Sequence, residues 1–184
     1  MGVWDELDIG VSVELDTNEL DNAISIVSGN EYFTDIGDEL EKLREDLNKN
    51  SDELAEQLAE RGKSLQQLAI GMNGTIASGD LLNSIEVEDD GERSYLVGTT
   101  INHFYPLVVE KGRGAVVPVR AKMLHFFTQS GDEVFTKYSK PFPGKPYVEP
   151  AYQQLLSDAD SIANGIFKWK GGLFFYVRKW WNHL

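Results

Sequence analysis

The stretch that decides the fold is Ser84-Ile85-Glu86-Val87-Glu88-Asp89-Asp90-Gly91-Glu92-Arg93-Ser94-Tyr95-Leu96-Val97. Ile85 and Val87 alternate with polar side chains, and Tyr95 and Val97 resume the alternation after Asp89-Asp90-Gly91. A period of two places the apolar residues on one face of a strand, and Asp-Gly favours a tight turn. The sequence therefore predicts a β-hairpin with one buried face.

A second hairpin is predicted further along the chain. It runs from Met123–Phe127 through the turn residues 130–132 to Val134–Tyr138. The apolar segment Phe104–Glu110 between the hairpins fits a short buried helix or strand. After the second hairpin, several residues predict a stiff extended linker, because proline fixes φ and disfavours helix before it: Pro141, Pro143, Gly144 and Pro146.

Helical spacing dominates the residues before the first hairpin. A short alternating strand over residues 11–15 is followed by a helix that Asp16 or Thr17 caps and that Gly29-Asn30 ends. A helical stripe follows at spacings of three and four: Phe33, Ile36, Leu40, Leu43 and Leu47.

Asn50 and Glu53 then have capping-box spacing, which predicts a new helix with one apolar side formed by Leu54, Leu58, Leu65 and Leu68. Because residues 48–51 interrupt the pattern and Gly62 weakens it, packing on a sheet is favoured over a long coiled coil.

Beyond Pro150, helical spacing resumes at Tyr152, Leu155, Leu156, Ala159 and Ile162. The predicted fold class is α+β, with N-terminal helices, an antiparallel sheet built from two β-hairpins, and a closing C-terminal helix with an aromatic extension. We divide the chain into residues 1–32 (N-terminal strand and helix), 33–157 (core) and 158–184 (aromatic, basic extension).

The last segment, residues 161–184, is aromatic, basic and free of acidic side chains. Its apolar residues fall near one helical face: Ile162, Ile166, Trp169, Leu173, Val177, Trp180 and Leu184. Three interpretations remain open, namely packing on the chain's own sheet, docking into a partner with Trp169, Trp180 and Trp181 as anchors, and attachment to a membrane surface.

The net charge of −13 is unevenly distributed. Residues 1–100 carry 24 acidic and 6 basic side chains, whereas residues 101–184 carry 6 acidic and 11 basic ones. Phosphates repel the acidic half, so direct binding of nucleic acid by it is disfavoured. The asymmetry fits docking of acidic onto basic surfaces between copies or neighbouring proteins, and the acidity also fits a high-salt host.

No arrangement of residues predicts catalysis, a metal or a cofactor. The chain has no cysteine, and His103, His125 and His183 have no carboxylate or histidine at ligand spacing. Gly112-Arg113-Gly114 lacks the further residues of a phosphate loop. The sequence also contains no secretory signal and no apolar run long enough for a bilayer, so we expect a soluble protein made in a cytoplasm.

Three ordered segments carry a family resemblance. Ser78-Gly79-Asp80-Leu81-Leu82-Asn83-Ser84-Ile85 is similar to a Thr-Gly-x-Leu-x-x-Ser-Ile passage from helix into strand, where Gly79 would stop the helix and Ile85 would begin the core face. Val97-Gly98 and Tyr105-Pro106-Leu107-Val108-Val109-Glu110-Lys111-Gly112 resemble Val-Gly followed by Tyr-Ala-x-x-Val-Glu-x-Gly-Thr. Lys145-Pro146-Tyr147-Val148-Glu149-Pro150-Ala151 is similar to Arg-Pro-Phe-Leu-x-Pro-Ala.

Together these segments resemble the lambdoid gene-ten-like family of tailed-phage neck, head–tail joining and tail-completion proteins. Proteins of contractile-tailed phages have a similar pattern, which leaves the station within the neck open. The resemblance implies structural roles for the motif residues, whose most informative positions are Gly79, Leu81, Ser84, Ile85, Gly98, Tyr105, Glu110, Gly112, Pro146, Tyr147, Pro150 and Ala151.

The resemblance also implies a virion protein without enzymatic activity. Such a protein would form a ring with copies of itself, contact neighbouring connector and tail proteins, and let DNA pass without specific binding. We expect Arg113, Arg120 and Lys122 to meet a neighbour and part of the acidic half to face the channel or the solvent. Two alternatives are an acidic regulator that mimics DNA and a protein attached to a membrane through its aromatic end; the second is disfavoured.

Overall fold

The computed structural model describes residues 7–28, 31–74, 79–101, 104–127, 131–167 and 175–179. The fold is α+β, as predicted. Its helices are α1 (Asn18–Ser28), the 3-10 turn η2 (Glu31–Phe33), α2 (Thr34–Met72), α3 (Asp80–Asn83), α4 (Tyr105–Lys111) and α5 (Val148–Ile166). Its strands are β1 (Ile9–Val13), β2 (Ile85–Gly91), β3 (Ser94–Thr99), β4 (Gly112–Arg113), β5 (Leu124–Phe127), β6 (Glu133–Thr136), β7 (Phe142–Pro143) and β8 (Phe175–Lys179).

The main sheet is antiparallel and has the strand order β2-β3-β1-β8. The first predicted hairpin is confirmed as β2–β3, and Val97 pairs with both Val87 and Ile9. Its turn lies at Glu92-Arg93 and not at Asp89–Gly91 as predicted, because β2 continues through Gly91 with a register shift after Asp89. Strand β1 lies two residues earlier than predicted and at the centre of the sheet, between β3 and β8. Because side chains alternate across a strand, Ile9, Ile85 and Val97 share the face that is buried under the helices.

Helix α2 is continuous for 39 residues, which corresponds to about 58 Å. The prediction of two helices separated at residues 48–51 is wrong. Asn50, the predicted cap, lies inside α2, and the next residue, Ser51, is fully buried and donates its hydroxyl to the Leu47 carbonyl oxygen at 2.8 Å within the helix. Leu47 on one side of the predicted break and Leu54 on the other pack into the same core, which favours a single helix.

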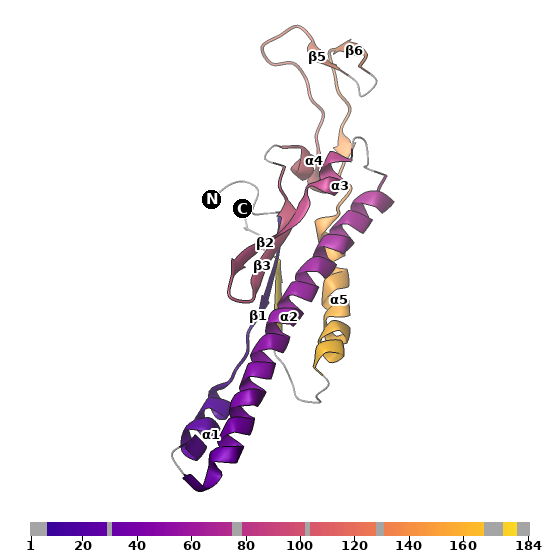
Figure 1. The fold of residues 1–184 in the computed structure, drawn as a ribbon. Helices are drawn as coiled ribbons and strands as arrows, with labels where there is room; N and C mark the ends of the chain where they lie inside the picture. The colour runs from indigo at the N-terminus through magenta and orange to yellow at the C-terminus, as the bar shows by residue number, and fades with distance from the viewer. Residues whose placement is uncertain are drawn as a thin grey trace.

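Helices α2 and α5 pack together against one face of the sheet (Figure 1). Gly62 allows their close approach, since a Cβ atom there would lie 3.4 Å from Cδ2 of Leu155. The core face of α2 also contains Gln66, whose amide donates to the Val97 carbonyl oxygen at 2.9 Å. Leu68, which was predicted on this face, is 57 % exposed.

The molecule is elongated, with the α1–α2 helical hairpin at one end and the β5–β6 hairpin at the other (Figure 1). The second predicted hairpin is therefore present, but it does not join the main sheet: β5 and β6 pair with each other in a separate two-stranded sheet. The expectation that both hairpins build one sheet is not met, because the chain leaves the body at β4 and returns at β7.

The chain's last described segment is a strand and not the predicted helix. Helix α5 ends at Ile166, and Phe175–Lys179 forms β8, which pairs antiparallel with β1. An apolar run of this length is compatible with either structure, and the free edge of β1 decides in favour of a strand. Trp169, Trp180 and Trp181 lie outside the described residues, so their predicted anchoring role stays a prediction.

Candidate functional site

Segments that are far apart in the sequence meet where the β5–β6 hairpin leaves the body. Gly112 of β4 pairs with Pro143 of β7, and Gly112 has a φ of +79°. A Cβ atom on Gly112 would lie 2.5 Å from the Gly144 nitrogen and the Phe142 carbonyl oxygen. This crossing requires glycine both for its left-handed backbone and for the contact between two main chains.

Glu110 caps the N-terminus of α5 from the neighbouring helix α4. Its Oε2 atom accepts hydrogen bonds from the backbone N–H groups of Tyr147 at 2.6 Å and Val148 at 3.0 Å. Both residues are at least 99 % buried, so their N–H groups need a protein acceptor. A carboxylate at this position also interacts favourably with the positive end of the helix dipole. Glu110 of the second motif segment thus binds the main chain of the third segment at Tyr147, and the resemblance singles out both residues.

Lys145 and Asn73 tie the same junction to the end of α2. The Lys145 ammonium donates to the Asn73 carbonyl oxygen at 2.7 Å, and the Asn73 amide donates to the Pro146 carbonyl oxygen at 2.8 Å. The backbone N–H of Lys145 donates to the Val109 carbonyl oxygen at 2.7 Å. Sequence reasoning missed Asn73, because its partners lie more than 70 positions away.

The first motif segment starts the sheet beside this junction. Gly79 has a φ of +85° and precedes the short helix α3, so it begins a helix instead of ending one, since α2 already ends at Met72. Leu81 and Ile85 are buried, as the motif implies. The Ser84 hydroxyl lies 2.7 Å from the Thr99 hydroxyl and joins β2 to β3.

The remaining motif positions have structural surroundings too. Gly98 lies against Asp8, and a Cβ atom there would overlap the carboxylate. Ala151 is buried on α5, whereas Pro146 and Pro150 are exposed and Tyr105 is 37 % exposed. Tyr147 is fully buried, and its hydroxyl has no hydrogen-bond partner within the described part of the chain. Burial and the nearby Glu110 carboxylate raise the pKa of this phenol well above its usual range, so it stays neutral.

Residues 113–142, which we call the arm, project beyond this junction and expose apolar side chains. Val119 is 92 % exposed, Phe127 is 64 % exposed and Phe135 is 56 % exposed. His125 stacks on Phe135 with ring centroids 4.6 Å apart, and its Nε2 atom lies 2.8 Å from the Glu133 carboxylate. The arm carries five basic and two acidic residues.

The three basic residues that were predicted to meet a neighbour all lie on the arm. Arg113 is half-buried at its base, and its guanidinium donates to the Ser139 hydroxyl at 2.7 Å. Arg120 and Lys122 are exposed on the outward leg. The structure therefore places these cations on one projecting element, next to exposed apolar side chains that sequence reasoning had assigned only to a hairpin.

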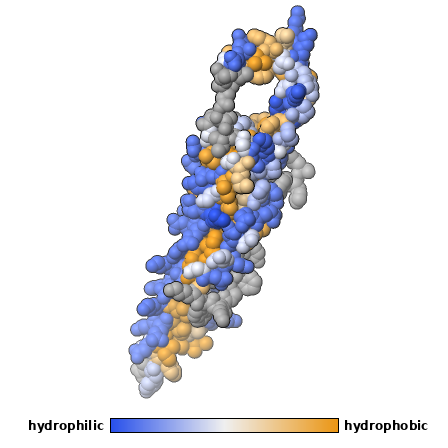
Figure 2. Space-filling view, turned by 90° about the vertical axis from the view of Figure 1, so that its right-hand side faces the viewer, coloured by the Kyte–Doolittle hydropathy of each residue, from blue (hydrophilic) through white to orange (hydrophobic). Residues whose placement is uncertain are grey.

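The opposite end, residues 14–47, carries eleven acidic and two basic residues; we call it the acidic end. It also exposes apolar side chains, with Tyr32 at 84 % and Ile26 at 77 % exposure. Ile36, which was predicted within a helical stripe, is 47 % exposed. Figure 2 shows hydrophobic surface at both ends of the molecule.

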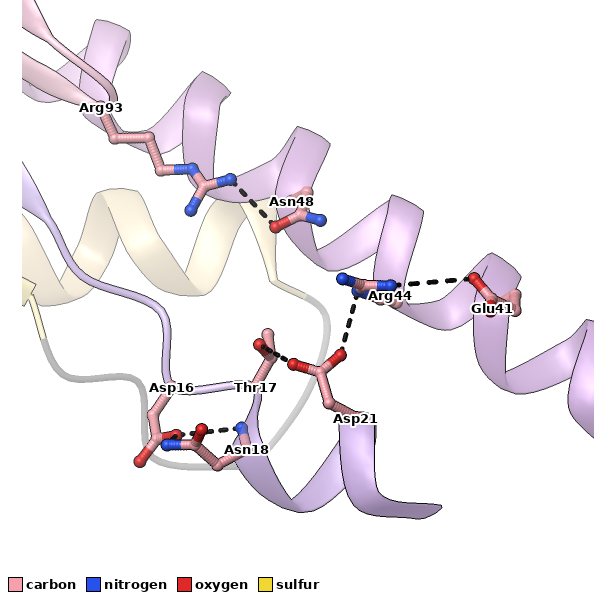
Figure 3. A network of polar contacts seen from close by, with 8 residues as sticks. All are labelled: Asp16, Thr17, Asn18, Asp21, Glu41, Arg44, Asn48 and Arg93. Carbon is pink, nitrogen blue, oxygen red and sulfur yellow. Dashed lines mark hydrogen bonds and ion pairs between the residues drawn. The ribbon is translucent and has the colours of Figure 1, made fainter. Parts of the chain in front are cut away.

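Polar contacts hold α1 against α2 at the acidic end (Figure 3). The Arg44 guanidinium on α2 lies 3.1 Å from the Asp21 carboxylate on α1, and the Asp21 side chain also accepts from the Thr17 hydroxyl at 2.8 Å. The Arg93 guanidinium at the β2–β3 turn donates to the Asn48 side chain at 2.9 Å. The Asp21–Arg44 pair thus ties α1 to α2, with Ile24 buried and Ile26, Tyr32 and Ile36 exposed.

The described residues contain no group of three or more histidine and acidic side chains that could hold a metal ion. No helix in the described ranges combines the length and hydrophobicity that crossing a membrane requires. Two surface hollows of about 230 and 320 Å³ lie beside β2–β3 and at the base of the arm. The hollow beside β2–β3 is lined by the carboxylates of Asp8, Glu86 and Glu88. The hollow at the base of the arm has Arg113, His125 and Ser139 as its polar lining.

Comparison of the chain with family models, curated proteins and solved structures returns no match.

Proposed function

We propose that this chain is a non-enzymatic structural protein of the head–tail connector of a tailed virus, in the neck or as a tail-completion protein. It assembles as a ring that joins the head to the tail around the DNA channel. It is made in the host cytoplasm and becomes part of the virion, where its partners are its own copies and the neighbouring connector and tail proteins.

One observation carries the proposal. Two of the three segments that resemble the lambdoid gene-ten-like family meet at the base of the arm, where Glu110 binds the main chain at Tyr147 and Val148. The third segment starts the adjoining sheet at Ile85. A shared structural role at one junction is what the resemblance implies for these segments, and their convergence supports it.

The surface chemistry supports an assembly role. Both ends of an elongated molecule expose apolar side chains, and contiguous exposed apolar surface marks interaction sites in soluble proteins. The body between them is strongly acidic, with exposed carboxylates on α2 and on β2, where Glu86 and Glu88 point away from the helices. An acidic wall repels phosphates and lets a duplex slide past without being held.

The proposal is tested by the composition and shape of particles. Quantitative mass spectrometry of purified virions should find the chain at a low, ring-like copy number per portal. Deleting its coding sequence should give filled heads and separate tails, and expression of the chain in trans should restore joined particles. Deletion of a dispensable non-virion gene serves as the control.

Two results would count against the proposal. Absence of the chain from purified particles would remove the virion role. Recovery of the chain only as a free protein bound to a basic nucleic-acid-binding protein would support the acidic regulator instead.

A further inference from the structure

Two surfaces at opposite ends of the molecule expose large apolar side chains. On the arm, Val119 and Phe127 are 92 % and 64 % exposed. On the acidic end, Tyr32 and Ile26 are 84 % and 77 % exposed. Burial of large apolar side chains is favourable, so both surfaces favour a protein partner.

The charges of the two surfaces select between the possible contacts. The arm has a net charge of +3, from five basic and two acidic residues, and the acidic end has −9, from two basic and eleven acidic residues. Contact between two arms or between two acidic ends brings like charges together. Contact between an arm and an acidic end brings opposite charges together, which steers the encounter and sets its orientation.

We propose that the arm of one copy docks on the acidic end of a second copy. Apolar side chains of the arm, with Val119 and Phe127 foremost, cover Tyr32 and Ile36, while Arg120 and Lys122 face the surrounding carboxylates. The inference rests on the self-association in the proposed function and specifies the two surfaces that produce it. The contact is heterologous, so repeating it gives a closed ring, or an open filament if the rotation does not close.

The construction of the arm supports a partner at this place. The β5–β6 hairpin pairs with no third strand in the described chain, and an isolated two-stranded hairpin is marginally stable in water. Its base is nevertheless fixed by the β4–β7 pairing and by the bridge between Val116 and Ser139. The fixed base sets the direction in which the arm projects. Docking on a neighbour would bury the apolar side chains that the hairpin exposes on its own.

A complementation experiment tests the inference. The arm variant is Val119→Ser with Phe127→Ser, and the end variant is Tyr32→Ser with Ile36→Ser; all four positions are exposed, and circular dichroism verifies the fold. Leu68→Ser with Met72→Ser is the matched control, because these α2 residues are 57 % and 79 % exposed but belong to neither surface. Sedimentation velocity of the full-length chain gives the mass of each species.

The wild type and the control should form oligomers, and each variant alone should associate about 100-fold more weakly. Equal amounts of the arm variant and the end variant should form a one-to-one dimer, because one intact arm and one intact acidic end remain. No larger species should form, since the second arm and the second end are both defective.

Other outcomes would overturn the inference. An end variant that associates with itself, beside an arm variant that does not, would show an arm-to-arm contact. Oligomers of both variants would show that the ring is built by other surfaces, and the proposed function would stand. A wild type that stays monomeric would exclude both surfaces as a site of self-association, while the particle composition would still decide the proposed function separately.

Discussion

Replacing Glu110 by alanine removes the carboxylate that caps α5 and joins it to α4. In the structure, one Oε2 atom accepts from the N–H groups of Tyr147 and Val148 at 2.6 and 3.0 Å. Alanine leaves both N–H groups without this acceptor, at positions that are 0 % and 1 % exposed. The perturbation therefore acts on the junction that fixes the arm to the body.

The cost follows from the two lost hydrogen bonds. Loss of a capping side chain costs about 0.5–2 kcal/mol, and each buried donor left unsatisfied costs about 1–3 kcal/mol. Because local relaxation admits some water, we expect Glu110→Ala to lower the free energy of unfolding by about 3 kcal/mol. For a chain of 184 residues this corresponds to a decrease in Tm of roughly 6–12 °C. Glu110→Gln keeps one oxygen acceptor but no charge, and it should cost about 1 kcal/mol.

Equilibrium unfolding in urea, followed by circular dichroism at a fixed low protein concentration, measures these differences without a change in assembly. Glu45→Ala is the matched control, because Glu45 is an exposed carboxylate on α2, and it should change stability by less than about 0.5 kcal/mol. If Glu110→Ala costs no more than this control, the carboxylate does not hold the junction and the reasoning is wrong.

Two further predictions concern other contacts of the body and the arm. The Arg61 guanidinium, which donates to Asp158 at 2.7 Å, lowers the pKa of that carboxyl below its ordinary value of 3.8. The stability from this pair is thus present above about pH 4 and is lost as the pH falls through the lowered pKa. Asp158→Asn should therefore decrease Tm by about 2 °C at pH 7 and by progressively less as the pH falls below about 4; a decrease that keeps its full size at acidic pH contradicts this. Gly112→Ala should lower the free energy of unfolding by about 3 kcal/mol, whereas Gly131→Ala should lower it by about 1 kcal/mol. Gly131 has a similar φ of +86° but no atom within 4 Å of its Cβ position. Equal losses in urea unfolding would refute the contact at Gly112.

Local patterns predicted local structure well. The alternation around Ile85 and Val97 predicted the β2–β3 hairpin, because it depends only on neighbouring residues. The predicted turn at Asp89–Gly91 was early, since those residues belong to β2 and the chain turns at Glu92-Arg93. The short helix at Tyr105–Lys111 and the extended linker that contains Pro143 were also within reach of the sequence.

Structure that depends on distant partners could not be predicted in the same way. The break at residues 48–51 was predicted from capping-box spacing, but burial of Ser51 against the body makes α2 continuous. Phe175–Lys179 forms a strand only because β1, more than 160 residues earlier, offers an edge. The separation of β5–β6 from the main sheet likewise depends on where β4 and β7 pair.

The candidate surfaces were predicted in part. Arg113, Arg120 and Lys122 were named from the charge pattern and the assembly that the resemblance implies. Glu110 was named from the resemblance, although its partners at Tyr147 and Val148 follow only from the fold. The exposed apolar residues of the acidic end were missed. Phe33 and Ile36 have the helical spacing of a core stripe, and spacing alone does not show that they are 46 % and 47 % exposed.

The central claim is that this protein acts through its exposed ends, as one subunit among copies at the head–tail junction. A cryo-electron microscopy reconstruction of the neck of intact particles tests it most directly. We predict a closed ring around the DNA in which each elongated subunit fits the density and each arm reaches the acidic end of the next copy. A neck whose density is fully occupied by other proteins, or rings in which every arm lies in solvent, would contradict it.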